Sequence, residues 1–320
     1  MAVTSKRKID IERFKSKVKE FWEITNHGPI KWFLSFQIKR DRESRTISIN
    51  QHAYIETVVE KFRLTSARKV VTSMDLNVQF SIQQCPSSLN QAACMNRVPY
   101  SKAIGLILWA TVVSRPDTAY AVGVLSQFIQ NPGQAHWKAV KRVISYLGST
   151  KDLWLTFGGN KQTLLEGYCD SDWASQPHRH LISSFSFHYS QRVISWSAKK
   201  QNIITLSSTE AEYVVETHAA KEGIWLKTFV KEVVGEDTGP ITIMGDNQGA
   251  IALAKGNKFH AQMKHINLRY HSNHEAIKKK QVVMKYILTM DNVADIFTKA
   301  LAKLKYTCFF ELLGLAIMKE

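Results

Sequence analysis

Apolar residues recur at helical spacing in several stretches of the chain, which predicts amphipathic helices. The clearest example is 135–147, where Trp137, Val140 and Ile144 share one side of the predicted helix. Its other side is basic and carries Lys138, Lys141 and Arg142. Helices with this pattern are predicted at 10–21, 53–62, 103–113, 117–130, 135–147 and 208–233.

Alternation of apolar and polar residues predicts strands elsewhere in the chain. Every second residue between 30 and 38 is apolar, and a charged turn separates this stretch from a second predicted strand at 46–50. In the second half, short apolar runs predict strands from 164 and at 182–190, 192–197, 241–244 and 282–288. The segment 71–100 is polar and irregular, so it is predicted to be a linker.

Acidic residues follow predicted strands in the second half of the chain. Asp170 and Asp172 end the strand that begins at 164, and Asp246 follows the strand at 241–244. Asp295 lies near the start of a helix predicted after the last strand. Taken alone, each acid is most simply a turn residue, a helix cap or a solvated group. Together they predict a cation site, because carboxylate oxygens are ligands for hard cations.

The helix predicted at 208–233 contributes a further carboxylate. Ser207 and Glu210 have the spacing of a capping box, which gives Glu210 a structural role at the helix start. Glu212 lies roughly 200° around the helix from Glu210 and is therefore free to face the sheet. The predicted set of carboxylates comprises Asp170, Glu212, Asp246 and Asp295.

Blocks of the second half resemble, in order, the RNase H domain of copia-type long-terminal-repeat retrotransposon polyproteins. They read GYCDSDWA, SWSAKKQ, LSSTEAEY, GDNQGAIALA, KHINLRYH and VADIFTKAL. Upstream, GPIKWFLSFQIKRDRES and SRPDTAYAVGVLSQFIQ resemble the end of the reverse transcriptase palm and the thumb and connection regions of the same family. The resemblance covers nearly the whole chain, from 14 to 315.

The resemblance implies an α/β fold. Its main part is expected to be an RNase H-like mixed five-stranded sheet flanked by helices, preceded by a truncated reverse transcriptase palm, thumb and connection region. The implied domains are a remnant of the palm and thumb start at 1–70, a helical thumb and connection region at 71–160, and an RNase H-like domain at 161–316.

The resemblance also implies a Mg²⁺-dependent endoribonuclease that cleaves the RNA strand of RNA–DNA hybrids with two ions, or with Mn²⁺ in their place. Asp170 is expected to bridge the two ions, with Glu212 and Asp246 on one and Asp295 on the other. The hybrid is expected to be held by its backbone and 2′-hydroxyls. Nucleic-acid contact is predicted for Trp32, Lys138, Lys141, Arg142, Lys199, Lys200, His265 and Arg269.

Structural roles are open alternatives for several of these residues. Trp32 fits the core of a hairpin, and the basic stripe at 135–147 fits a solvated helix face. The segment 260–274 carries four histidines, but their spacing fits no common zinc site and no cysteine accompanies them. His265 is expected either to have a structural role or to assist product departure near the carboxylates.

The charge of the chain favours a polyanionic partner, because Lys+Arg 43 against Asp+Glu 27 gives a formal net charge of +16. The four cysteines have no CxxC spacing, which predicts free thiols in a reducing compartment. The charged N-terminus does not read as a signal peptide, and no apolar run approaches the ~20 residues that span a bilayer. We therefore expect an intracellular protein, cytoplasmic or nuclear, with no membrane partner. The resemblance implies a virus-like particle as its location within the cell.

The chain also departs from the family pattern. The polymerase Tyr-x-Asp-Asp block is absent and no Asp-Asp pair occurs anywhere, so reverse transcription is not expected. Asn267 stands where Asp is usual and Ser184 where Gly is usual, which indicates relaxed constraint. A non-catalytic nucleic-acid-binding remnant and a pseudo-protein that is never stably made are therefore alternatives. If the ribonuclease is active, its carboxylates are expected to belong to a self-contained unit that survives removal of residues 1–155.

Overall fold

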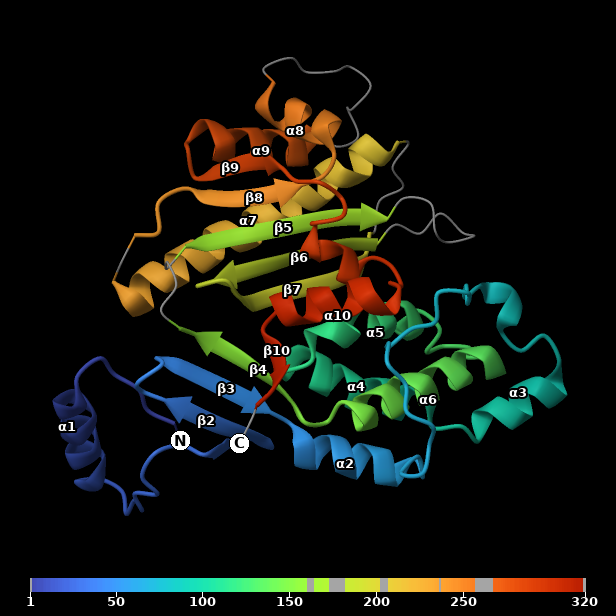
Figure 1. Cartoon of the computed structure of the whole chain (residues 1–320), viewed down its shortest axis with the longest axis horizontal. Helices are drawn as coiled ribbons and strands as arrows, with labels where there is room; N and C mark the ends of the chain where they lie inside the picture. The colour runs from blue at the N-terminus through green and yellow to red at the C-terminus, as the bar shows by residue number, and fades with distance from the viewer. Residues whose placement is uncertain are drawn as a thin grey trace.

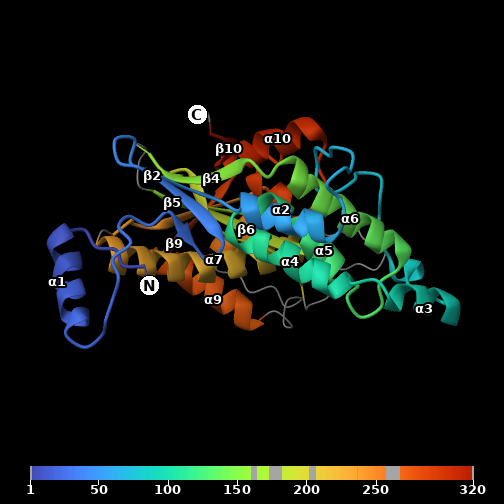
Figure 2. The same cartoon turned by 90° about the horizontal axis from the view of Figure 1, so that it is seen from below.

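The computed structural model describes residues 2–159, 164–172, 182–201, 207–235, 237–256 and 267–318, with the backbone alone described for 267–272. The strands of these residues form two five-stranded sheets. In Figure 1 the antiparallel sheet lies at the lower left, the mixed sheet lies above it, and most helices of the first half lie at the lower right. Figure 2 shows α1 (Lys8–Lys19) standing at one side of the molecule, and none of its residues is buried.

The antiparallel sheet has the strand order β1-β2-β3-β4-β10. Its strands are β1 (Trp32–Phe33), β2 (Phe36–Asp41), β3 (Thr46–Asn50), β4 (Leu153–Gly158) and β10 (Leu315–Ile317). The prediction of one strand over 30–38 is wrong, because the chain turns back at Leu34 and Ser35, whose φ angles are 45° and 70°. Two positive φ angles are typical of two-residue hairpin turns, and this turn lays β1 beside β2.

The mixed sheet has the order β7-β6-β5-β8-β9. Its strands are β5 (Leu165–Asp172), β6 (Ile182–Tyr189), β7 (Arg192–Lys200), β8 (Ile241–Gly245) and β9 (Val282–Tyr286). β6 is antiparallel to both β5 and β7, whereas β8 is parallel to both β5 and β9. This order and these directions confirm the predicted RNase H-like sheet.

Helices cover the mixed sheet, as predicted. The long helix α7 (Ser208–Val234) packs across β5, β6 and β8, and α8 (Gln248–Lys255) and α9 (Asn267–Lys278) pack against α7 (Figure 1). The apolar core beneath α7 includes Phe187, Tyr213 and Ile243, each fully buried. The α/β fold class is therefore confirmed.

The helices of the first half form a bundle around a second core. They are α2 (His52–Lys61), α3 (Leu89–Asn96), α4 (Tyr100–Val113), α5 (Ala119–Ser126) and α6 (Gln134–Ser149). The helix predicted over 117–130 is shorter than expected, because α5 ends at Ser126. The linker predicted over 71–100 is wrong, because this segment contains α3 and contributes Met74 and Phe80 to the core of the bundle.

A third buried cluster joins the two sheets and the helical bundle. It contains Tyr146 from α6, Leu155 from β4, Val193 from β7 and Leu315 from β10. The strand β10 pairs with β4, so the chain returns to the antiparallel sheet after it has built the mixed one. Between the sheets lie the 3₁₀ helix η4 (Val293–Phe297) and α10 (Lys303–Leu312), which also contribute to this cluster (Figure 1).

Candidate active site

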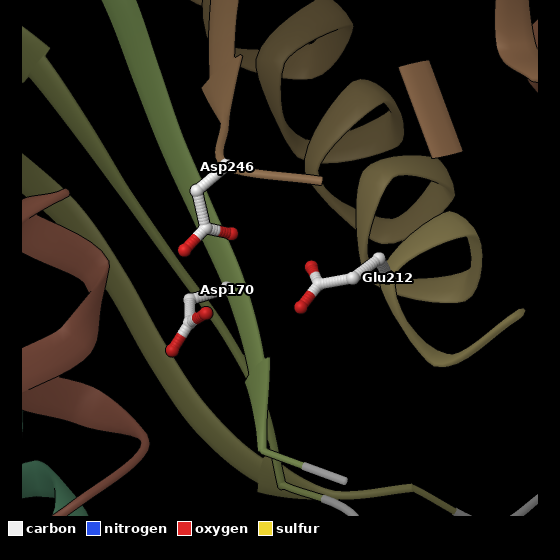
Figure 3. A group of neighbouring side chains, drawn as sticks. All are labelled: Asp170, Glu212 and Asp246. Atoms are coloured by element: carbon white, nitrogen blue, oxygen red, sulfur yellow. The ribbon is translucent and has the colours of Figure 1, made fainter. Parts of the chain in front are cut away.

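Three carboxylates meet at one end of the mixed sheet. Asp170 comes from β5, Glu212 from α7, and Asp246 from the residue that follows β8 (Figure 3). Each offers a ligand oxygen, and these oxygens all lie within 4.8 Å of one another. Asp170 and Glu212 are buried, at 4% and 7% exposed, and Asp246 is half-buried. Carboxylate oxygens this close together, two of them on buried side chains, are suitable ligands for a hard divalent cation.

The parallel pairing of β5 and β8 brings the two aspartates together. Tyr168 lies opposite Met244 in this register. Asp170 and Asp246 each lie two residues further along their strands, so both reach the same level at the carboxyl end of the sheet. Asn247 then begins α8, because its side-chain oxygen accepts a hydrogen bond from the backbone N–H of Ala250 at 3.0 Å.

The start of α7 places Glu212. Ser207 caps the helix, as predicted: its hydroxyl accepts a hydrogen bond from the backbone N–H of Glu210 at 3.2 Å. Two residues on, Glu212 faces the sheet, and its Oε1 accepts a hydrogen bond from the backbone N–H of Ser171 at 3.2 Å. The helical phase thus separates Glu210 from Glu212, and only Glu212 joins the carboxylate group.

Burial makes ionisation of the group unfavourable. Burial, followed by the nearby charge of Asp295, raises the pKa of Asp170 to about 7. Burial and the charges of Asp170 and Asp246 raise the pKa of Glu212 well above its ordinary value. The buried carboxylates therefore retain protons to higher pH than free side chains, unless a cation compensates their charge. This donor chemistry fits a hard divalent cation.

Asp295 lies near the other three carboxylates but in a different environment. It belongs to η4, where a helix start was predicted, and it is fully buried. Its Oδ1 lies 2.7 Å from Nζ of Lys299, and its Oδ2 lies 2.6 Å from Nζ of Lys305. Its oxygens lie outside the group that meets within 4.8 Å, although its charge acts on Asp170.

A network of hydrogen bonds attaches η4 to β5. The Thr298 hydroxyl donates to Oδ2 of Asp170, and the side-chain amide of Asn292 donates to the carbonyl of Cys169 at 2.9 Å. The Ser184 hydroxyl lies 3.0 Å from the carbonyl of Ala294, to which it donates. Ser184 therefore has a structural role in this chain, since its side chain links β6 to η4.

The sequence patterns do not single out these supporting residues. Thr298 and Lys299 stand in the VADIFTKAL block, and their closeness in sequence to Asp295 is the one pattern that indicates a role near the carboxylates. Asn292 and Ser184 carry no comparable signal, because their roles depend on backbone groups that only the fold brings near.

The predicted nucleic-acid contacts are spread over several elements. Trp32 is 56% exposed in β1, Lys138 is exposed on α6, and Lys199 and Lys200 end β7. Lys141 is half-buried on α6. Arg142 donates to Thr72 Oγ1 at 3.1 Å and lies 3.6 Å from Asp75, so it has structural partners. Arg269 lies in α9, where only the backbone is described, and His265 lies outside the described residues.

Comparison with known proteins identifies the family. The chain is 37% identical over 316 residues to the retrovirus-related Pol polyprotein from transposon TNT 1-94 of Nicotiana tabacum, a match that covers 98% of this chain. The chain belongs to the copia/Ty1-type retrotransposon Pol polyproteins. The Pol polyprotein from transposon RE2 of Arabidopsis thaliana is 28% identical over 92% of the chain. The chain spans about a quarter of the TNT 1-94 polyprotein and a fifth of RE2.

Two further similarities concern parts of this Pol segment. The secreted RxLR effector protein 161 of Plasmopara viticola is 43% identical over 142 residues, which are all of that protein and 44% of this chain. Among solved structures, the N-terminal RNase H domain of a Mycobacterium tuberculosis protein matches 47% of this chain and 98% of its own, with 11% identity and a TM-score of 0.33. No family model matches the chain. Among its described helices, none is long and apolar enough to cross a bilayer.

Proposed function

We propose that this Pol segment is a metal-dependent ribonuclease H that cleaves the RNA strand of RNA–DNA hybrids. One observation carries the proposal: carboxylates from β5, α7 and the end of β8, on an RNase H-like sheet, offer oxygens within 4.8 Å of one another. The family membership and the net charge of +16 support it, because the substrate is a polyanion.

Asp170, Glu212 and Asp246 are the residues that would hold Mg²⁺, with Mn²⁺ as a substitute. A bound divalent ion supplies an activated water and stabilises charge on the leaving oxygen during phosphodiester hydrolysis. The chain's own part is to keep these carboxylates together and shielded from bulk water. Thr298 orients the Asp170 carboxylate through its hydrogen bond. Asp295 belongs to the proposed catalytic set through its charge on Asp170.

The proposed partner is the RNA–DNA hybrid. Lysines at the end of β7, Lys199 and Lys200, and on α6, Lys138 and Lys141, are the proposed phosphate contacts among the described residues. Trp32, Arg269 and His265 remain predicted contacts. We propose the domains 1–70, 71–160 and 161–316 as the palm and thumb remnant, the thumb and connection region and the RNase H-like domain, and we do not expect polymerase activity from these 320 residues.

A second candidate is a non-catalytic nucleic-acid-binding role. It is favoured by one observation, the pairing of Asp295 with two lysines, which occupies a carboxylate expected to bind metal. Under this alternative the chain binds hybrid with the same salt dependence but leaves both strands intact.

The test is an assay of the purified chain on a hybrid whose RNA strand is end-labelled, with matched RNA, DNA and double-stranded RNA substrates. We expect RNA cleavage in the hybrid alone, with Mg²⁺ or Mn²⁺, and none after chelation of the metal. Hybrid binding without cleavage under every metal condition would reject the ribonuclease and leave the binding role.

A further inference from the structure

Two lysines neutralise Asp295 inside the protein. The carboxylate is 0% exposed, and each of its oxygens faces one ammonium group, Oδ1 at 2.7 Å from Lys299 and Oδ2 at 2.6 Å from Lys305. Both lysines are themselves about two-thirds buried, with side chains 37% and 32% exposed. A buried carboxylate is stable when ionised only if opposite charges lie this close.

Backbone geometry fixes one of these lysines in place. Lys299 lies four residues after Asp295, and its backbone N–H donates to the Asp295 carbonyl at 3.2 Å. The preceding residue, Thr298, is hydrogen-bonded to Asp170. Lys299 therefore follows directly on a residue anchored to the three-carboxylate group. Lys305 approaches from α10, and its ammonium group also donates to the carbonyl of Thr289 at 3.3 Å.

The charge of Lys299 reaches beyond Asp295. It lowers the pKa of Asp170, opposing the effects of burial and of Asp295. In return, burial lowers the pKa of Lys299, while Asp170, Asp295 and Asp246 together raise it above its ordinary value. Lys299 is therefore a permanent positive charge that acts on both Asp295 and the three-carboxylate group.

The charges of the carboxylates and lysines bear on how many divalent ions the site can bind. With a cation bound and all four carboxylates ionised, Asp170, Glu212, Asp246 and Asp295 would carry four negative charges, and the two lysines supply two positive ones. One divalent ion supplies the remaining two. A second divalent ion at Asp295 would have to displace a lysine ammonium group from this buried carboxylate, which breaks one of its two close ion pairs.

We propose that the site binds a single divalent ion, at Asp170, Glu212 and Asp246, and that Lys299 and Lys305 hold Asp295 as fixed cations in place of a second ion. This inference rests on the proposed function and changes one part of it, the expected pair of ions. Lys299 and Lys305 then act as positioning residues that hold the Asp295 carboxylate near Asp170.

The number of bound ions tests the proposal independently of cleavage. Mn²⁺ bound to the full chain is counted by electron paramagnetic resonance, with and without a hybrid whose RNA strand carries 2′-O-methyl groups and cannot be cleaved. We expect one Mn²⁺ per chain in both conditions. Asp295→Asn is expected to keep one ion, because Asp295 is not a ligand, but with a higher Kd, because the charges of Lys299 and Lys305 near Asp170 lose their partner.

Removal of the two lysines should free Asp295 to bind a second divalent ion. The double variant K299Q/K305Q is expected to bind two Mn²⁺ in the presence of the blocked hybrid, whereas K299R should still bind one. Lys303→Gln, which removes an exposed lysine at the start of α10, is the control for loss of a nearby lysine that does not contact Asp295, and it should also bind one. Circular dichroism of each variant verifies that it is folded.

Two Mn²⁺ in the wild type, falling to one in Asp295→Asn, would overturn the proposal while leaving the ribonuclease intact. That result does not require the double variant to fold. Binding of no Mn²⁺ under either condition would overturn both the one-ion site and the proposed function.

Discussion

Burial of individual carboxyl groups raises their pKa values at this end of the mixed sheet. Besides the carboxylates of the candidate site, Glu216 is 1% exposed on α7, one turn after Glu212. Among the described residues its Oε2 has no hydrogen-bond partner. Burial raises the pKa of Glu216 to about 8, with the charge of Lys255 acting in the opposite direction. The folded state therefore favours the protonated form of this side chain.

The pH dependence of stability tests this assignment. Because the pKa of Glu216 is raised in the folded state, its contribution to stability is complete below the ordinary Glu pKa and is lost as the pH rises through about 8. Between pH 6 and 9 we expect the wild type to lose about 2 kcal/mol of unfolding free energy relative to Glu216→Gln. Urea unfolding of both proteins at pH 6 and pH 9 measures this difference in unfolding free energy.

The control for this prediction is Glu232→Gln, which removes an exposed carboxylate from the same helix. It should follow the pH dependence of the wild type. Equal pH slopes for the wild type and Glu216→Gln would show that Glu216 is ionised in the folded protein over this range.

At the scale of elements, local signals and tertiary context each decided part of the structure. The cap at Ser207 and the helical period were sufficient to predict α7 and to direct Glu212 toward the sheet. Alternation over 30–38 was misleading, because a turn at Leu34 and Ser35 needs positive φ at residues that do not favour it. The segment 71–100 was misread as a linker, because Met74 and Phe80 are buried by helices distant in sequence.

The two glutamates at the start of α7 provide a matched pair of variants. Glu212→Gln should reduce metal-dependent cleavage strongly, because it removes a charge from the group that meets within 4.8 Å. Glu210→Ala should preserve cleavage and lower the unfolding free energy by about 0.5–2 kcal/mol, through loss of its role at the helix start. Cleavage rates and urea unfolding of both variants distinguish the metal-binding role of Glu212 from the structural role of Glu210. Interchanged effects would mean that Glu210 is the residue that faces the metal.

At the scale of the whole molecule, the mixed sheet is tied to the rest of the chain. Tyr306 of α10 donates to the carbonyl of Asp117 at 2.9 Å, and Asp117 forms a buried ion pair with Arg115 at 2.7 Å. Trp196 of β7 donates to the carbonyl of Thr111 at 3.2 Å. That the carboxylates belong to a self-contained unit stays a prediction, and these contacts argue against it, since trimming residues 1–155 removes these partners and half of β4. No local pattern in the sequence reports such long-range packing.

A substitution in the shared core tests this coupling. Leu315 of β10 is 0% exposed and belongs to the cluster that joins the sheets. Leu315→Ala is expected to lower the unfolding free energy by about 2–4 kcal/mol while the protein still unfolds in one transition. Ile317→Ala, on the same strand but 70% exposed, should change it by less than about 0.5 kcal/mol. Two separate transitions in urea, with Leu315→Ala shifting just one, would show that the parts fold independently.

The central claim is that Asp170, Glu212 and Asp246 make this Pol segment a metal-dependent ribonuclease H. The most direct test is the rate of RNA-strand cleavage in a labelled hybrid by wild type, Asp170→Asn and the neighbouring control Asp172→Asn, purified identically to exclude a contaminating nuclease. With Mg²⁺ we predict cleavage by the wild type and by Asp172→Asn, a loss of about 100-fold or more in Asp170→Asn, and unchanged hybrid binding in all three. Cleavage by Asp170→Asn at the wild-type rate would contradict the claim.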